Sequence, residues 1–186
     1  MPYLLRYKTA MFPNQYWSID ITYIKMHRHH MYLTAIIDWY SRKIVGWELA
    51  DTLATYPVLQ AVRNAVEQYG TPSILNSDQG SQFTSTEYRN LLRELHITQS
   101  MDGRKRWADN VIVERWFRSL KQEEIYINEY RSPQELRRAI GEYVRNYNTI
   151  RPHQALENKT PDEIYYTPFS RTATNAAGLD SAPLAC

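Results

Sequence analysis

The sequence has almost no cysteine: in 186 residues the single one is Cys186, at the very end. An internal disulfide and a cysteine metal cluster are therefore excluded. No run approaches the roughly 18 apolar residues of a membrane span, and no signal peptide opens the chain. These absences exclude a transmembrane protein and a disulfide scaffold. We expect a cytoplasmic protein of a reducing compartment, without a membrane partner.

The whole chain also has almost no excess of positive over negative charge, since its formal net charge is only +2. A hydrophobic content of 43% and a charged content of 23% are ordinary for a globular protein, and the length allows a buried core. Between residues 104 and 121, however, two acidic residues face six basic ones: Arg104, Lys105, Arg106, Arg115, Arg118 and Lys121. This local positive field indicates a surface for nucleic acid.

The hydrophobic periodicity predicts strands first and helices later. Trp17, Ile19, Ile21 and Tyr23 alternate with polar residues, which predicts a half-buried strand over 17–26 with Asp20 on its polar face. Strands at 31–41 and 43–50 follow after short links, as in an antiparallel meander. Further strands are expected at 72–78 and 97–100, and helices at 55–70, 84–96, 108–126, 132–156 and 160–166. This order predicts a mixed sheet flanked by helices, of the α/β or α+β class.

The ends of the chain lack such periodicity. Residues 1–13 are expected to be a lead-in segment before one core domain over 14–166, and the Ala/Thr/Ser-rich residues 167–186 a disordered tail. The histidines at 27, 29 and 30 fall in the expected first hairpin turn. Their spacing there does not make a closed zinc site, so we interpret them as surface residues.

Three carboxylates stand out because they come from three different elements. Asp20 lies within the first strand, Asp78 ends the strand at 72–78, and Glu114 lies in the helix at 108–126. Magnesium prefers oxygen ligands, and two ions about 4 Å apart can hold the attacking and leaving oxygens of a phosphoryl transfer. Each residue also has a simpler interpretation. Asp20 could be a strand residue on a solvated face, Asp78 could form an Asx turn, and Glu114 could be a surface partner of Arg118.

Five blocks in order carry a resemblance: WSIDITYI (17–24), AIIDWYSRKIVGWEL (35–49), NSDQGSQFTS (76–85), DNVIVERWFRSLK (109–121) and YNTIRPHQAL (147–156). Together they resemble the catalytic core of bacterial insertion-sequence transposases of the IS-three type, in the retroviral-integrase superfamily. The thirty-five residues between Asp78 and Glu114 match the separation typical of that family. The resemblance covers residues 14–166.

The resemblance implies a ribonuclease H-like α/β fold with a mixed five-stranded sheet. It implies that Asp20, Asp78 and Glu114 are the aspartate–aspartate–glutamate (DDE) catalytic triad and the ligands of two Mg²⁺ ions, for which Mn²⁺ can substitute. The implied reaction is cleavage of DNA at the element ends and transfer of the freed 3′-hydroxyl to target DNA. DNA phosphate contacts are expected from Lys121, Arg118, Arg115, Arg104, Lys105, Arg106 and Gln79.

The sequence also departs from the family pattern. Met1 lies only 19 residues before Asp20, which leaves no room for an upstream end-recognition domain, and Lys105 stands where the family often has glycine. Three explanations stay open: a second reading frame joined by frameshifting, a single domain of a longer protein, and a truncated relic. The first implies a helix-turn-helix partner protein from an upstream frame. We expect a homo-oligomer on DNA, associated with the bacterial nucleoid. The alternatives are a catalytically idle DNA-binding or regulatory fragment of a transposase and a generic ribonuclease H-like nuclease.

Overall fold

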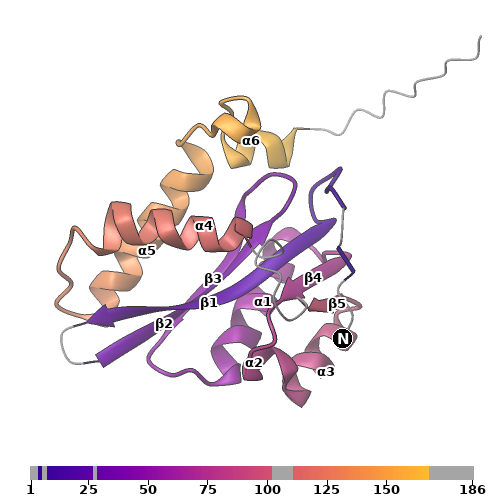
Figure 1. The fold of residues 1–186 in the computed structure, drawn as a ribbon, viewed down its shortest axis with the longest axis horizontal. Helices are drawn as coiled ribbons and strands as arrows, with labels where there is room; N and C mark the ends of the chain where they lie inside the picture. The colour runs from indigo at the N-terminus through magenta and orange to yellow at the C-terminus, as the bar shows by residue number, and fades with distance from the viewer. Residues whose placement is uncertain (1–3, 6–7, 27–28, 102–110, 168–186) are drawn as a thin grey trace, which may run out of the picture.

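A five-stranded mixed sheet forms the centre of the molecule (Figure 1). The structure, a computed structural model, describes residues 4–5, 8–26, 29–101 and 111–167. The strands lie in the order β3-β2-β1-β4-β5, with β1 to β3 antiparallel and β4 and β5 parallel to β1. Their bounds are β1 Tyr16–Met26, β2 His29–Asp38, β3 Ile44–Ala50, β4 Ile74–Ser77 and β5 Thr98–Met101. The predicted meander and the predicted mixed sheet are confirmed.

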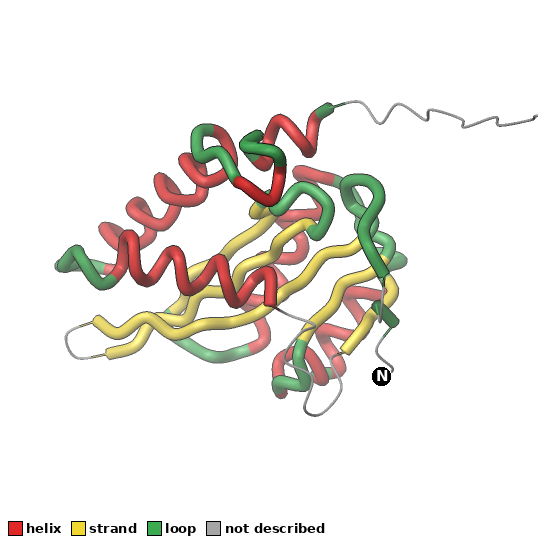
Figure 2. Tube along the Cα trace, turned by 45° about the horizontal axis from the view of Figure 1, so that its top comes forward, coloured by secondary structure: helices red, strands yellow, loops and turns green. Residues whose placement is uncertain are grey.

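Helices cover both faces of this sheet (Figure 2). One face carries α1 (Thr55–Tyr69), α2 (Ser81–Thr84) and α3 (Thr86–Glu94). The opposite face carries α4 (Val111–Leu120), which continues into a π-helical turn at Lys121–Ile125, and α5 (Pro133–Thr149). A 3-10 turn at Gln154–Leu156 and helix α6 (Pro161–Tyr166) complete the described chain. In the part of the chain that the structure describes, no helix is long and apolar enough to cross a membrane.

Each face of the sheet has its own hydrophobic core. Trp17 and Ile19 of β1 pack with α1 and α3 residues such as Val62 and Leu92. Ile24 and Met26 of the same strand belong to the other core, beneath α4 and α5. A sheet covered on both faces in this way is a three-layer α/β arrangement.

This double coverage corrects the predicted pattern of the first strand. Tyr23 was expected to face the core, but it is 62% exposed, whereas Ile24 and Met26 are buried. The reason is that α1 and α3 cover only the first half of β1, and the α4 layer covers the opposite face of its second half. The buried face of the strand therefore changes along its length.

The second strand ends three residues earlier than predicted, because Asp38 starts a tight turn. Its Oδ1 accepts hydrogen bonds from the backbone N–H and the hydroxyl of Ser41, at 2.8 and 2.7 Å. Its Oδ2 accepts one from the backbone N–H of Asn14, at 2.9 Å. Burial raises the pKa of Asp38, and the bonds from Ser41 and Asn14 oppose that rise.

Two predicted helices and one predicted loop also need correction. The helix expected over 132–156 ends at Thr149, because Pro152 cannot continue it and disfavours helical backbone in the residue before it. The residues expected to form a loop after Asp78 include the short helix α2. The helix expected over 108–126 becomes π-helical at Lys121, and its expected start lies outside the described residues. The expected tail is likewise outside them, apart from Thr167.

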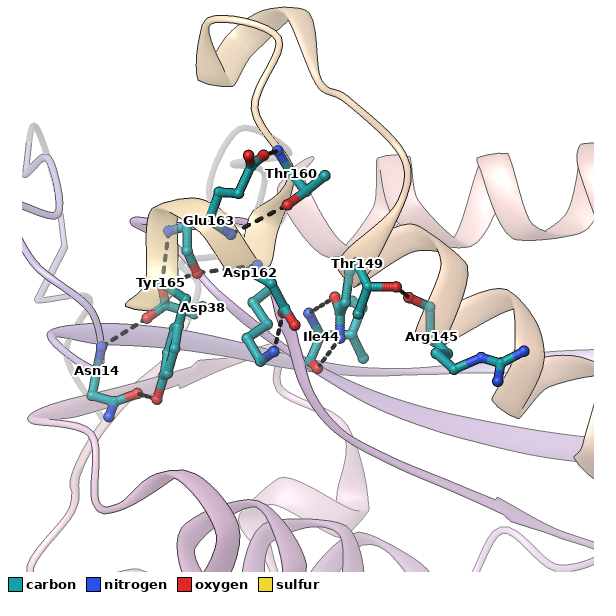
Figure 3. Close-up of polar contacts among 12 residues, drawn as sticks. Asn14, Asp38, Ile44, Arg145, Thr149, Thr160, Asp162, Glu163 and Tyr165 are labelled. Carbon is teal, nitrogen blue, oxygen red and sulfur yellow. Dashed lines mark hydrogen bonds and ion pairs between the residues drawn. The ribbon is translucent and has the colours of Figure 1, made fainter. Parts of the chain in front are cut away.

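The predicted helix starts are confirmed where they are described. Ser85 accepts from the backbone N–H of Tyr88 at 3.1 Å, although no reciprocal capping box forms there. Ser132 caps α5 in the same manner, and Thr160 and Glu163 form a complete capping box at α6. Figure 3 shows the Thr160–Glu163 pair.

The last helix is tied to the sheet by a buried ion pair. The ammonium of Lys43, only 3% exposed, pairs with the carboxylate of Asp162 on α6. It also lies 4.9–5.5 Å from the centroids of three rings, those of Tyr69, Tyr165 and Tyr166. Nearby, the Tyr165 hydroxyl donates to Asn14 Oδ1 at 3.0 Å (Figure 3). These contacts hold the end of the described chain against its beginning.

We predict that Asp162→Asn lowers the free energy of unfolding by about 2 kcal/mol, because it leaves a buried ammonium without its anion. Urea unfolding followed by circular dichroism measures the change. The matched control is Glu157→Gln, which removes a carboxylate that is 89% exposed and 3.9 Å from its lysine. Equal midpoints for the two variants would contradict a stabilising role for the buried pair.

Candidate active-site cleft

The pairing of β1 with β4 sets the relative position of the two aspartates. Tyr16 pairs with Ile74, and Ser18 pairs with Asn76. The same parallel register, continued by two residues, puts Asp20 level with Asp78, the first residue after β4. Side chains two residues apart on a strand share a face, so Asp20 faces the α4 side together with Ile24.

Helix α4 brings the third carboxylate to this face. Val113, Trp116 and Leu120 form an apolar stripe that is buried against the sheet, and Glu114 lies exposed beside it. A cleft of about 440 Å³ opens between β1 and α4, which we call the acidic cleft. Its lining includes Asp20, Thr22, Glu114, Phe117, Arg118, Lys121, Gln122 and Tyr126.

The acidic cleft joins two of the three predicted carboxylates and two of the predicted basic residues. Asp78 does not line it, and Arg115 lines a different cleft. Across the described residues, no three side chains from His, Cys, Asp and Glu come close enough to hold one metal ion together. Arg104, Lys105 and Arg106 lie outside the described residues.

Lys121 lies between Asp20 and an exposed tyrosine. Its ammonium is 4.9 Å from the centroid of the Tyr23 ring. Burial lowers the pKa of Lys121, and the carboxylate of Asp20 opposes this by raising it. Lys121 is the first residue of the π-helical turn, a distortion that often occurs at functional sites.

Asp78 lies exposed at the start of a short, well-anchored loop. Its Oδ1 accepts a hydrogen bond from the backbone N–H of Gly80 at 2.8 Å, which is the geometry of the Asx turn that the sequence left open as the simpler interpretation of Asp78. The loop is fixed from both sides, since Gln82 donates to the Leu53 carbonyl at 2.7 Å and Gln99 donates to the Phe83 carbonyl at 2.8 Å. Gln79 is exposed within the same loop.

Several lining residues of the acidic cleft were not predicted. Tyr126 is 71% exposed and follows the π-helical turn, a distortion that the hydrophobic periodicity does not reveal. Thr22 could have been found, because it lies two residues beyond Asp20 on the same face of β1.

Comparison with known proteins decides the family. The sequence matches the integrase core domain over residues 11–106, and a second integrase core domain profile matches residues 95–161. The chain belongs to the integrase core domain family. Asp20 and Asp78 lie within the first match and Glu114 lies within the second.

Curated relatives of this integrase core are insertion-sequence transposases. The transposase for insertion sequence element IS904 of Lactococcus lactis subsp. lactis (strain IL1403) is 36% identical over 160 residues, 83% of this chain and 62% of the relative. Transposase InsF for insertion sequence IS3A of Escherichia coli (strain K12) is 30% identical over 155 residues, 82% of this chain and 54% of the relative. The chain thus spans only about half to three fifths of these relatives. The resemblance to IS-three type transposases is confirmed.

Solved structures confirm the ribonuclease H-like fold. One chain of the simian T-cell lymphotropic virus intasome in complex with PP2A regulatory subunit B56 gamma has a TM-score of 0.80 at 18% identity, covering 95% of this chain and 63% of that one. The HTLV-2 integrase catalytic core domain in complex with magnesium (trimeric form) has a TM-score of 0.71 at 22% identity, covering 84% of this chain and 99% of that one.

The proximity of Asp20 to Lys121 gives a direct test of the acidic cleft. Asp20→Asn removes the carboxylate that raises the pKa of Lys121, while the burial that lowers it remains. We predict that the Lys121 pKa falls, so that at a fixed alkaline pH more of its amine is neutral and reactive. Acetylation rates of individual lysines, measured by mass spectrometry, report the change. Asp51→Asn, a change of an exposed aspartate, should leave the rate at Lys121 unaltered.

Proposed function

We propose that this integrase core is the catalytic core of an insertion-sequence transposase, with Asp20, Asp78 and Glu114 as its catalytic carboxylates. The observation that carries the proposal is the acidic cleft, where Asp20 of β1 and Glu114 of α4 meet beside Lys121. The register of β1 and β4 supports the third member, since the paired residues Ser18 and Asn76 each come two positions before one of the two aspartates. The alternatives open from the sequence alone, a solvated strand residue and a surface partner of Arg118, do not account for this shared cleft.

The donor set suits magnesium. Carboxylate oxygens are hard ligands, and Mg²⁺ is commonly held by one or two carboxylates together with water and substrate phosphate. Asp20 and Glu114 already provide two such groups in one cleft, and Asp78 is available one strand away. We infer that these residues would hold two ions, with Mn²⁺ as a substitute. Bound there, the ions would stabilise charge on the phosphate oxygens and favour deprotonation of the attacking water or hydroxyl.

The chain's own residues would then bind and orient DNA. Lys121 and Arg118 line the acidic cleft and can neutralise phosphate oxygens, so they would set the position of the strand. Gln79 and the loop after Asp78 would contact the backbone from the other side. In strand transfer the 3′-hydroxyl oxygen forms a new bond to phosphorus, and the bond to the departing 3′ oxygen of the target strand breaks. The hydroxyl proton passes to water, the departing oxygen takes a proton from water and leaves as a 3′-hydroxyl, and no covalent protein intermediate is required.

The reaction also implies partners. Two element ends must be brought together on one target, so we infer that the core works as an oligomer on DNA. The matched transposases are longer than this chain. We infer that a helix-turn-helix region or partner protein, additional to this core, recognises the element ends.

We predict that wild-type protein gives cleaved and joined products from labelled oligonucleotides with Mg²⁺ or Mn²⁺ but not with EDTA. Glu114→Gln keeps the side chain's size and removes a metal-binding charge, so product formation should fall at least about 100-fold. Glu67→Gln, at an exposed position of α1, is the control and should match wild type. Strand transfer at the wild-type level by Glu114→Gln or by Asp78→Asn would contradict the proposal. DNA binding without any metal-dependent product would favour the idle-fragment alternative.

Gly80 gives a second, independent test. A Cβ at this position would lie 2.9 Å from Asp78 Oδ1, so Gly80→Ala must displace the carboxylate. The backbone φ of −57° suits alanine, and little change in stability is expected. We predict a loss of strand transfer of about 10- to 100-fold, as for other small misplacements of a reacting group. In the matched control, Gly141→Ala, the new Cβ meets Trp47 at an ordinary 3.5 Å, and activity should be kept.

A further inference from the structure

A second cleft, of about 380 Å³, adjoins α4 beside the acidic cleft. We call it the basic cleft, because its lining includes Arg42, Arg115, Arg151 and His153. Residues 114, 118 and 121 line the acidic cleft, and residues 111, 115 and 119 line the basic one. These are neighbouring ridges of one helix, about 100° apart. A ligand that extends across α4 can therefore reach both clefts.

The basic cleft carries an excess of positive charge. Glu123 pairs with Arg151 through both terminal guanidinium nitrogens, one of them at 2.9 Å, and accepts from the Tyr143 hydroxyl at 2.8 Å. Asp38 is the carboxylate that acts on Arg42. Among the residues that the structure describes, neither Arg42 nor Arg115 makes an ion pair. Burial lowers the pKa of Arg42. Tyr147 and Asp38 oppose this effect, and the positive charge of Arg115 adds to the lowering. An anion between the two guanidinium groups would offset the repulsion between Arg42 and Arg115.

Arg42 is held in place by a strained turn. Its φ of 65° lies in the left-handed region, which is unfavourable for arginine and easy for glycine. The backbone N–H of Arg42 donates to the Asp38 carbonyl at 2.9 Å, and the Asp38 carboxylate fixes the same turn through Ser41. An arginine that keeps this conformation, half-buried and without an ion pair among the described residues, points to a role for its side chain.

The far wall of the basic cleft is aromatic and uncharged. Tyr147 and His153 pack edge to face with ring centroids 4.6 Å apart. Burial raises the pKa of Tyr147 to about 12, so its phenol remains neutral. Burial also lowers the pKa of His153, an effect that Arg151 and Arg42 reinforce and that Glu123 and a hydrogen bond with the Tyr147 backbone oppose. The wall therefore adds no negative charge that would repel an anion.

We propose that the basic cleft binds a backbone phosphate of the same DNA strand whose scissile phosphate lies in the acidic cleft. This inference rests on the proposed function. The planar guanidinium forks of Arg42 and Arg115 suit phosphate oxygens, and two such groups can grip one phosphate. The two ridges of α4 are about 100° apart, so one strand that crosses the helix can reach both clefts.

DNA binding, measured under conditions in which no DNA is cleaved or joined, tests the role of the basic cleft. Fluorescence anisotropy with a labelled duplex is measured in EDTA over a series of salt concentrations, for wild type, Arg42→Gly, Arg115→Gln and the double variant. We expect each single variant to bind about 3- to 10-fold more weakly and the double variant to show a salt slope smaller by about one to two. Arg63→Gln, which removes an exposed arginine of α1, is the matched control and should bind like wild type.

Arg42→Gly separates binding from folding. Glycine fits the left-handed backbone, so its urea midpoint should equal or exceed that of wild type while DNA affinity falls. If the urea midpoint of Arg42→Gly is so low that unfolding explains its weaker DNA binding, the proposal is overturned. Equal DNA affinity and equal salt slope for wild type and the double variant would also overturn it.

Inorganic phosphate distinguishes a free anion from a DNA phosphate. If phosphate raises the unfolding temperature of wild type but not of the double variant, while both bind DNA equally, the cleft takes a free anion only and the proposal fails. A different result would show that only the proposed function fails. In that case DNA binding would still depend on Arg42 and Arg115, but no metal-dependent product would form. A wild type that does not bind DNA would overturn both.

Discussion

The hydrogen-bonded register between β1 and β4 is the constraint on which the site depends. Adjacent strands lie about 4.8 Å apart, and each residue advances the chain by about 3.3 Å. A shift of one residue would turn Asp20 toward the opposite core and away from α4. The register is protected because Trp17 and Leu75, a paired set, are both fully buried in the same core. Packing on one face of the sheet thereby fixes a carboxylate on the other.

Helix α4 acts as a partition between two polar clefts. Its buried stripe of Val113, Trp116 and Leu120 fixes its rotation on the sheet. That rotation directs Glu114 and Lys121 to one side and Arg115 to the other. One ridge of α4 brings Glu114, together with Arg118 and Lys121, to the cleft that also contains Asp20, and the next ridge presents Arg115 to the other cleft. The helix can line both clefts only because its apolar residues occupy a narrow stripe.

Much of this arrangement could be predicted from the sequence, where local pattern and motif spacing carry the information. The strands, the main helices, the caps at Ser132 and Thr160 and the candidate carboxylates all follow from such signals. The switch of buried face between Ile19 and Ile24 could not be predicted, because it depends on which helix covers each half of β1. The end of β2 depends on a bond between Asp38 and Asn14, twenty-four residues apart. Arg115 and Arg118 line different clefts, and this depends on how α4 is rotated on the sheet. The positions of the basic residues in the sequence do not give that rotation.

The ties around Lys43 and Asn14 have a consequence for how the chain is made. The Tyr165–Asn14 bond joins residues 151 positions apart, and Lys43 finds its anion 119 positions later. During synthesis the sheet can assemble while α6 is still inside the ribosome, but the buried ammonium then has no carboxylate. We infer that the fold closes only after the final helix emerges. In chains cut short before Asp162, the surface around Lys43 would stay uncovered, and quality-control proteases could recognise it.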